Sequence, residues 1–209
     1  MIIVLKGSEK TAHRELFEQH LRFRYEVFQR GRGWSVPGGS ESDPYDDDDA
    51  VYFFDLDDAR LIQASVRITP TIKSSLIADY FPHLVENGQP PRAPAIYERT
   101  RLVVQRPHGT PGGSRHARSR VTTATLEWCL GHGISYLQTV IDYGDLPAYL
   151  ALTPLTIPLG LPHPYGGGRA TPGGGECMAV RWPICPQLLA DVRNYFAPDG
   201  TETEPSRLH

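Results

Sequence analysis

One arginine of this 209-residue chain falls on what the spacing predicts to be the buried stripe of a helix. Phe17, Leu21, Arg24 and Phe28 stand three or four residues apart, so the guanidinium shares a helical face with three apolar side chains. Because burying an unpaired guanidinium is costly, we expect Arg24 to meet carboxylates. The acidic run ESDPYD at residues 41–46 follows the helix and can supply them.

Further charged residues stand inside apolar segments that read as strands. Arg67 lies opposite the apolar face of the strand predicted at 61–69, so we expect it to project into a cleft rather than the core. Glu98 and Arg101 belong to the strand predicted at 95–105, and strict alternation places them on opposite faces unless a bulge shifts the register. Charges in such positions indicate an internal polar network with a functional role.

These residues need a sheet and flanking helices to position them. The sequence predicts strands at residues 2–5, 51–57, 61–69, 95–105, 134–141, 156–161 and 178–182. It predicts helices at residues 8–28, with Ser8 as the cap, and at 76–84, 118–132, 146–152 and 186–196. This order is typical of an α/β sandwich. We expect a single domain over residues 1–198 and a disordered polar tail at 199–209.

Composition narrows the function classes. The chain is 40% hydrophobic and 22% charged with a net charge of -3, which fits a soluble globular protein and argues against a general nucleic-acid binder. No apolar stretch is long enough for a signal peptide or a membrane span, and the three cysteines follow no metal-ligand or disulfide spacing. We therefore expect a cytoplasmic protein with no membrane insertion and no metal site.

The charges are unevenly distributed along the chain. Residues 41–58 hold nine acids and no base, whereas residues 99–120 hold six arginines and no acid. Such a basic segment indicates a local anionic partner, although a solvated loop gives the same pattern. No GxxxxGK[ST] loop, GxGxxG turn or GxSxG elbow is present.

Five segments, in this order and at these separations, resemble the acyl-homoserine-lactone synthases, the LuxI-type autoinducer synthases of quorum sensing. They are RFRYEVFQRGRGW (22–34), ESDPYD (41–46), ASVRITPT (64–71), DYFPHL (79–84) and YERTRLVV (97–104). The resemblance covers about the first 105 residues well. It implies a GNAT-like three-layer α/β/α sandwich with a central mixed, mostly antiparallel sheet. It also implies an acyltransferase that joins S-adenosylmethionine (SAM) to an acyl group from coenzyme A or an acyl carrier protein, without a prosthetic group.

The resemblance carries roles to individual positions. It implies catalytic roles for Glu98 and Arg101. It implies SAM-binding roles for Arg24, Phe28, Trp34, Asp43, Asp46, Arg67 and Phe81. It implies roles at the acyl chain or donor for Thr100, Thr139, Arg106, Arg115 and Arg118. Thr139 matches a position that accompanies 3-oxo chains, whereas the stretch 143–162 resembles members that take short or aromatic acyl-CoA.

The residue types suit that chemistry. Glu98 can act as a base, directly or through water, on the amine of SAM. The amine then attacks the thioester, and the SAM carboxylate closes the lactone as methylthioadenosine leaves. Arg67 or Arg101 can pair with that carboxylate, and Trp34 and Phe81 offer aromatic faces to the cation and to adenine. Three alternatives stay open: charged residues that only hold loop and helix together, a GNAT-type N-acyltransferase with another amine acceptor, and a binding module without catalysis.

Overall fold

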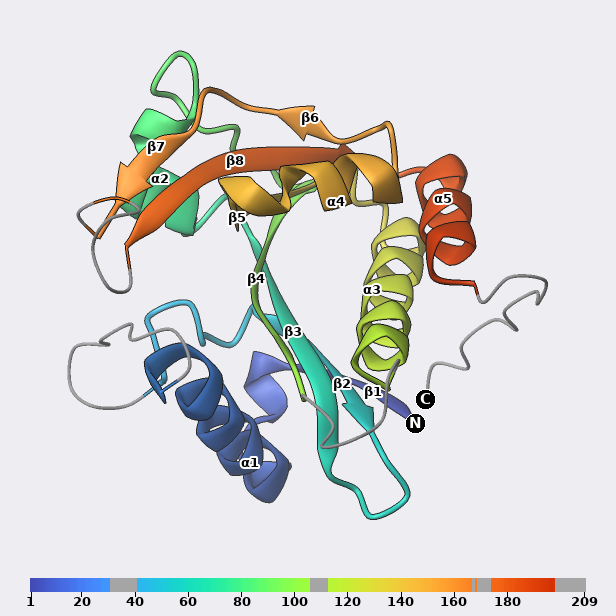
Figure 1. Cartoon of the computed structure of the whole chain (residues 1–209). Helices are drawn as coiled ribbons and strands as arrows, with labels where there is room; N and C mark the ends of the chain where they lie inside the picture. Colours follow the sequence, from blue (N-terminus) through green and yellow to red (C-terminus); the bar gives the residue numbers. More distant parts are fainter. Residues whose placement is uncertain (31–40, 106–112, 167, 169–173, 198–209) are drawn as a thin grey trace. The chain divides into compact units, whose positions relative to one another are not determined.

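The computed structural model describes residues 1–30, 41–105, 113–166, 168 and 174–197 (Figure 1). The strands are β1 (Ile2–Lys6), β2 (Val51–Leu56), β3 (Ile62–Pro70), β4 (Ile96–Val104), β5 (Tyr136–Asp142), β6 (Ile157–Pro158), β7 (His163–Tyr165) and β8 (Gly175–Pro183). The α-helices are α1 (Arg14–Tyr25), α2 (Leu76–Tyr80), α3 (Gly113–Gly131), α4 (Leu146–Leu152) and α5 (Pro186–Phe196). Short 3-10 turns lie at Gly7–Glu9, Pro82–Leu84 and Tyr143–Asp145.

Backbone pairing gives a mixed, mostly antiparallel sheet, as predicted. The strand order is β1-β2-β3-β4-β5-β8-β6, and β7 pairs with β8. β4 runs parallel to β5, while β1–β2, β2–β3, β5–β8, β6–β8 and β7–β8 are antiparallel. The parallel ladder joins three residue pairs and ends at Glu98 and Gln138, although both strands continue beyond it.

The chain divides into two compact units, which we describe separately. Unit 1 comprises residues 1–68, 101–125 and 196–209, and unit 2 comprises residues 69–100 and 126–195. Strand β4 and helix α3 each contribute residues to both units. The sequence prediction of one domain over residues 1–198 stays a prediction, and the tail at 199–209 lies outside the described residues.

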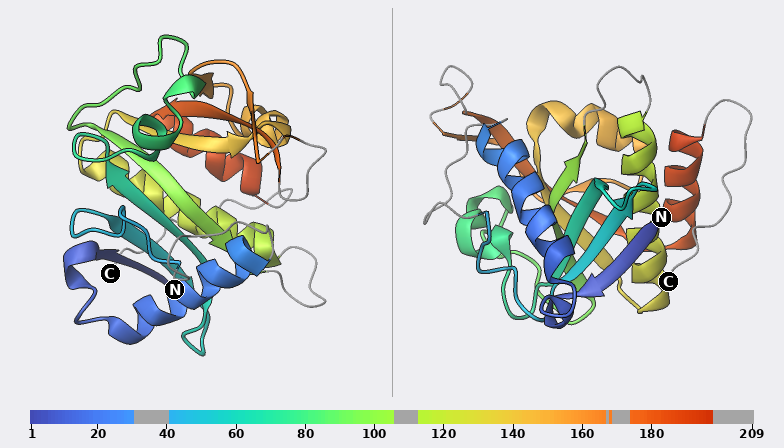
Figure 2. Two further views of the ribbon diagram at one scale, coloured as in Figure 1. Left: turned by 90° about the vertical axis from the view of Figure 1, so that its left-hand side faces the viewer. Right: turned by 90° about the horizontal axis from the view of Figure 1, so that it is seen from below.

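Helix α1 lies along the sheet of unit 1 (Figure 2), and aromatic side chains make up much of the packing between them. The ring of Phe17 meets Tyr52 and Phe54 edge-on, with centroids 4.9 and 5.7 Å apart. The predicted cap at Ser8 is wrong, because Gly7–Glu9 forms a 3-10 turn in which the Glu9 carboxylate accepts the Lys6 amide. The helix begins at Arg14, ends at Tyr25 and passes into a π-helical turn over Glu26–Arg30.

In unit 2 the two faces of the β5–β8 pair carry different helices. Ile77 of α2 packs with Leu84, Cys177 and Ala179 on one face. On the other face Leu146 and Tyr149 of α4 pack on Ile141, Met178 and Val180, and α4 lies along β8 in Figure 1. A residue's parity along β5 or β8 therefore decides which helix it meets.

Most of the predicted elements are confirmed, and the misses have local causes. The strand predicted at 156–161 shrinks to Ile157–Pro158, since the ring of Pro158 removes a ladder donor. The short strand β7 was not predicted; it is three residues long and has Pro164 at its centre, so it carries little strand pattern. α3 begins at Gly113, five residues before the predicted start. None of the helices in the described ranges is long and apolar enough to cross a bilayer.

Candidate functional site

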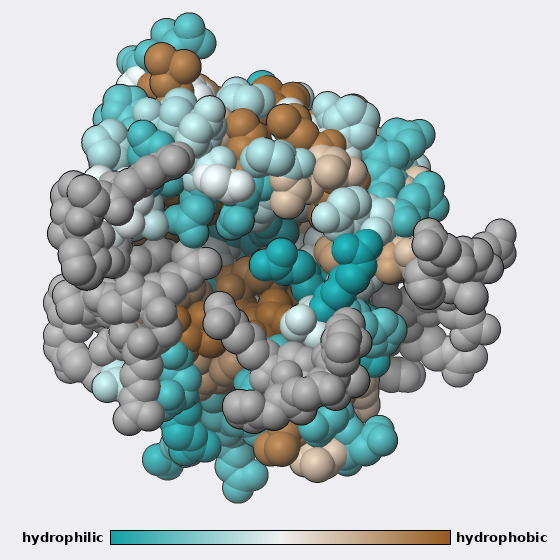
Figure 3. Space-filling model, viewed as in Figure 1, coloured by the Kyte–Doolittle hydropathy of each residue, from teal (hydrophilic) through white to brown (hydrophobic). Residues whose placement is uncertain are grey.

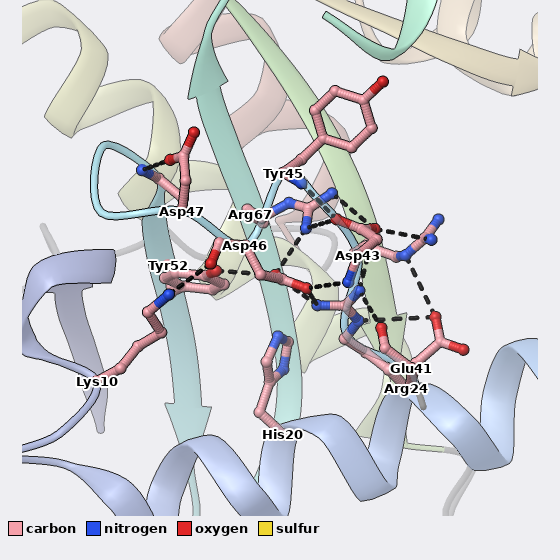
Figure 4. Close-up of polar contacts among 12 residues, drawn as sticks. Lys10, His20, Arg24, Glu41, Asp43, Tyr45, Asp46, Asp47, Tyr52 and Arg67 are labelled. Atoms are coloured by element: carbon pink, nitrogen blue, oxygen red, sulfur yellow. Dashed lines mark hydrogen bonds and ion pairs between the residues drawn. The ribbon is translucent and has the colours of Figure 1, made fainter. Parts of the chain in front are cut away.

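Six charged residues of unit 1 form one group, which we call the arginine–carboxylate cluster (Figure 4). Its members are Arg24, Arg67, Arg101, Glu41, Asp43 and Asp46. They come from α1, the acidic run, β3 and β4, which are far apart in sequence. Three positive and three negative formal charges balance, so the cluster can be buried without a net charge.

Arg24 is fully buried and binds the acidic run at several points, as predicted. Its Nη1 donates to Oδ1 and Oδ2 of Asp46 at 2.8 and 3.0 Å. Its Nη2 donates to the Glu41 carbonyl at 2.6 Å and to Asp43 Oδ2 at 3.3 Å. The two-pronged contact and the backbone contact fix the run against α1.

Arg67 makes the second set of contacts with the same aspartates. Its Nη1 donates to Asp43 Oδ1 and Asp46 Oδ1, each at 2.6 Å, and Nη2 donates to Asp43 Oδ2 at 3.1 Å. Tyr52 is the cross-strand partner of Arg67, and its hydroxyl donates to Asp46 Oδ1 at 2.8 Å. The prediction that Arg67 projects into a cleft is wrong, because its side chain is fully buried. The face opposite the apolar one is covered by the acidic run.

Arg101 is the most exposed arginine of the cluster, with 16% of its side chain accessible. Its Nη2 lies 2.9 Å from Asp43 Oδ2, its Nε lies 3.3 Å from Glu41 Oε1, and its guanidinium stacks over Phe28 at 5.3 Å. Arg101 has a φ of 55°, a left-handed conformation that costs a non-glycine residue about 1–3 kcal/mol. Strict alternation is thus interrupted at Arg101, and the expectation that it faces away from Glu98 no longer applies.

The charges around the cluster set the protonation of its neighbours. Burial would raise the pKa of Asp46, but Arg67 and Arg24 outweigh it and hold this pKa below its ordinary value. Burial and the Asp46 carboxylate raise the pKa of Tyr52. Burial and Arg24 lower the pKa of His20 well below its ordinary value. Asp46 is therefore charged while Tyr52 and His20 are neutral near pH 7.

Glu98 belongs to unit 2 and is fully buried. Ser75 donates its hydroxyl to Oε2 at 2.5 Å, and the amide of Ile77 donates to Oε1 at 3.1 Å. Ser75 also caps α2 by accepting from the Ala78 amide at 3.2 Å, so the carboxylate sits at the start of that helix. Its carboxylate is therefore held in one orientation by the start of α2.

The other predicted residues lie in varied surroundings. Phe81 is partly buried against the apolar cluster around Ile77. Thr139 is partly buried in β5, and its hydroxyl donates to the Val140 carbonyl at a long 3.3 Å. Thr100 is partly buried in β4. Trp34 and Arg106 lie outside the described residues.

The arginines of α3 differ from one another. Arg115 and Arg118 are exposed, and Arg115 stacks over Phe196 at 5.3 Å. Arg120 instead pairs with the fully buried Asp55 at 2.5 Å, although its own side chain is still 38% accessible. Arg115 and Arg118 are the more exposed arginines of α3.

Three contributors to these arrangements were not assigned a role from the sequence. Glu41 belonged to the quoted acidic run, but nothing in its spacing distinguished it from its neighbours. Tyr52 could have been found from the hairpin, because a turn at residues 57–58 places it beside Arg67. Ser75 had a recognisable signal, since a serine before an apolar run is a typical helix cap.

The comparisons with known proteins agree with the resemblance. A family model described as autoinducer synthase matches residues 8–146. The chain is 31% identical over 165 residues to an isovaleryl-homoserine lactone synthase of Bradyrhizobium diazoefficiens, covering 78% of this chain and 73% of that protein. It is similar to the solved structure of BjaI, a CoA-dependent acyl-homoserine lactone synthase with SAM and isopentyl-CoA. That match has a TM-score of 0.79 and 28% identity and covers 100% of this chain and 95% of the other.

A more distant likeness concerns the fold alone. A protein from Lactobacillus plantarum described as an N-acetyltransferase matches with a TM-score of 0.57 and 14% identity, over 88% of this chain and 99% of the other. Together with the match to BjaI, this confirms the predicted GNAT-like α/β fold.

Proposed function

The chain belongs to the autoinducer synthase family and is an acyl-homoserine-lactone synthase, and from this premise we propose how its residues handle two substrates, SAM and an acyl thioester. The observation that supports the assignment is the convergence of the quoted motifs. Arg24, Asp43, Asp46, Arg67 and Arg101 come from four separate segments and meet in one buried cluster. Chance similarity of short motifs would not require that convergence.

The contacts divide the cluster into two roles. Arg24 and Arg67 are fully buried and engaged with the acidic run, so we assign them a positioning role. Arg101 retains accessible surface, and a guanidinium can bind the SAM carboxylate in a two-pronged contact. Asp43 and Asp46 are assigned to the SAM site on the resemblance, where their pairs with Arg24 and Arg67 hold the acidic run in place.

Aromatic residues complete the proposed SAM site. Phe28 backs the Arg101 guanidinium, so it holds that group in place. Phe81 and Trp34 are assigned to the cation and adenine of SAM on the resemblance. These assignments follow the chemistry of SAM, which combines a flat base with a sulfonium centre.

Glu98 is the proposed base. Because its carboxylate is buried and held by Ser75 and Ile77, we assign it to act through a bridging water on the SAM ammonium. The freed amine forms a bond to the thioester carbon, and the carbon–sulfur bond breaks to release the thiol. The SAM carboxylate then attacks the carbon next to the sulfonium, and methylthioadenosine leaves as the lactone closes.

The residues that we assign to the acyl donor are also chosen by charge and position. Arg115 and Arg118 present exposed charge on α3 and are assigned to an anionic acyl donor, either coenzyme A or an acyl carrier protein. Thr100 and Thr139 are assigned to the acyl group. We place the enzyme in the cytoplasm, where both substrates are made, with no nucleic-acid partner.

The test is a donor panel with purified protein. SAM is mixed with acyl-CoA or with acylated carrier protein, and mass spectrometry follows the acyl-homoserine lactone and methylthioadenosine. We expect both products in equal amounts with one class of donor. An N-acylated product on a different amine, with no lactone, would overturn the proposal. Extracts of a heterologous host that expresses the chain provide an independent check.

A further inference from the structure

Another buried arginine, adjacent to Glu98 in sequence, differs from those of the cluster. Arg99 is 5% exposed and lies on the opposite face of β4 from Glu98, since it contacts α4 whereas Glu98 contacts α2. Its Nη2 donates to the Tyr149 hydroxyl at 2.5 Å. Its guanidinium also stacks over the rings of Trp182 and Tyr149, at 4.8 and 5.6 Å.

In the described ranges, no carboxylate forms an ion pair with the Arg99 guanidinium, whereas each arginine of the cluster in unit 1 pairs with an aspartate or glutamate. A guanidinium has five N–H donors, and the Tyr149 hydroxyl takes one of them. Two aromatic faces compensate part of the burial cost of the cation, but they satisfy none of the remaining donors.

The residues around Arg99 hold it in place. Trp182 donates its indole N–H to Thr156 Oγ1 at 2.8 Å, and Thr156 donates to the carbonyl of Tyr149 at 3.0 Å. This chain of contacts ties β8 to α4 beside the guanidinium, where the rings of Tyr149 and Trp182 are neighbours with centroids 5.4 Å apart. The Tyr149 phenol accepts from Arg99, so its own proton can be donated elsewhere.

The surroundings are otherwise apolar. Ile141, Met178 and Val180 line the same face together with Leu146. Thr139 shares this face by strand alternation, one residue beyond the last paired position of the parallel ladder. Figure 3 shows hydrophobic side chains among polar ones at the surface of the region that carries α4, where Leu150 is 45% exposed.

We infer that Arg99 and Tyr149 form a specificity site for an acyl group that carries an acceptor oxygen beyond its thioester carbonyl. An apolar face beside the remaining N–H groups of Arg99 and the hydroxyl of Tyr149 suits a carbon chain that bears an oxo group or a carboxylate. It penalises a plain alkyl chain, which offers these donors no acceptor. A carboxylate makes the strongest contact, because it also neutralises the buried charge. This inference rests on the proposed function and adds the class of acyl substrate.

Three coenzyme A thioesters of equal chain length test it: hexanoyl, 3-oxohexanoyl and adipoyl. The wild-type protein is expected to use at least one of the two oxygen-bearing donors with a kcat/KM at least about tenfold above that for hexanoyl-CoA. Arg99→Met, which keeps the side-chain length but removes the charge, is expected to abolish this preference and to leave hexanoyl-CoA within about threefold of wild type. Arg14→Met removes an exposed arginine of α1 and serves as the control.

The outcomes separate the possibilities. A uniform loss with all three donors in Arg99→Met would show that Arg99 only supports the fold, and a wild-type preference for hexanoyl-CoA would overturn the inference directly. If Arg99→Met fails to fold, Arg99→Lys decides, since it keeps the charge but loses the planar fork, and it should reduce the preference without reversing it. Lactone formation without any donor preference refutes the specificity site alone, whereas no lactone with these thioesters or with the same acyl groups on carrier protein refutes the proposed function.

Discussion

Buried charge is handled differently in the two units of this protein. In unit 1, Arg24 and Arg67 each meet carboxylates at 2.6–3.3 Å, and the cluster balances to zero. In unit 2, Glu98 accepts from a hydroxyl and a backbone amide, and Arg99 donates to the Tyr149 phenol and lies over the neighbouring rings of Tyr149 and Trp182. A balanced network stabilises a fixed loop. The contacts described for Glu98 and Arg99 come from neutral groups, and we propose that both residues act on the substrates.

The largest effect should come from Glu98. Glu98→Gln is nearly isosteric and can still accept from Ser75 or Ile77, so the fold should survive while turnover falls by about 10² to 10⁴. Stopped assays of lactone formation give kcat, and calorimetry gives the affinity for SAM, which should change little. Near-normal turnover across the pH range would remove Glu98 from the role of base.

For Arg24, we expect the substitution to lower stability rather than turnover alone. Arg24→Met leaves Asp46 and Asp43 buried without that partner, and deleting one member of a buried pair costs about 3–5 kcal/mol of unfolding free energy. Arg14→Met is the matched control on the same helix. Its ion pair with Glu18 is exposed and contributes at most about 1 kcal/mol. Equal unfolding midpoints for the two variants in denaturant titrations would contradict the scaffold role of the cluster.

The two regions were not equally predictable from sequence. An arginine on an apolar helical stripe followed by an acidic run is a strong signal for a buried ion pair, because a buried guanidinium needs carboxylate or other acceptor partners. The pairing of Arg24 with Asp43 and Asp46 was therefore predicted correctly. The strands of the hairpin were predicted for a similar reason, since alternation and an Asp-Asp turn leave little freedom.

The failures share the opposite cause, which is that tertiary contacts override local pattern. The left-handed backbone at Arg101 has no local signature, because ion pairs with Glu41 and Asp43 accompany it. Spacing also gives no sign of the surroundings of Arg99, because its partners Tyr149 and Trp182 are at least 50 residues away in sequence. Residues whose role depends on such distant partners cannot be assigned from spacing alone.

Measuring the free energy of unfolding as a function of pH tests the surroundings of the arginine–carboxylate cluster without mutating its charged residues. His20 is fully buried, its Nδ1 lies 3.0 Å from Ser65 Oγ, and burial and Arg24 lower its pKa well below 6.5. Below pH 6.5, His20 binds a proton in the unfolded chain but not in the folded chain. The free energy of unfolding therefore falls as pH falls. The expected slope is at most about 1.4 kcal/mol per pH unit.

His20→Asn should remove that slope between pH 6.5 and 5, as followed by thermal unfolding. Asp46 does not interfere in this window, because its pKa is held below 3.8 by Arg67 and Arg24, and its contribution is lost only in stronger acid. The exposed His116 on α3 provides the control, and His116→Asn should leave the slope as in wild type. The same slope in His20→Asn would show that another group titrates.

The smallest effect on activity is expected from the exposed arginines of α3, in contrast to the buried charges. Arg115→Glu together with Arg118→Glu should raise the KM of the acyl donor about two- to tenfold, because each exposed charge contributes about 0.2–1 kcal/mol. Arg120 is left intact, since reversing it would oppose the buried Asp55 and destabilise unit 1. The effect should shrink as ionic strength rises, while the KM of SAM stays nearly unchanged.

The KM of an acylated carrier protein should rise more than that of acyl-CoA, because a carrier protein presents several acidic side chains to both arginines at once. A raised KM for SAM with an unchanged donor KM would assign α3 to the other substrate.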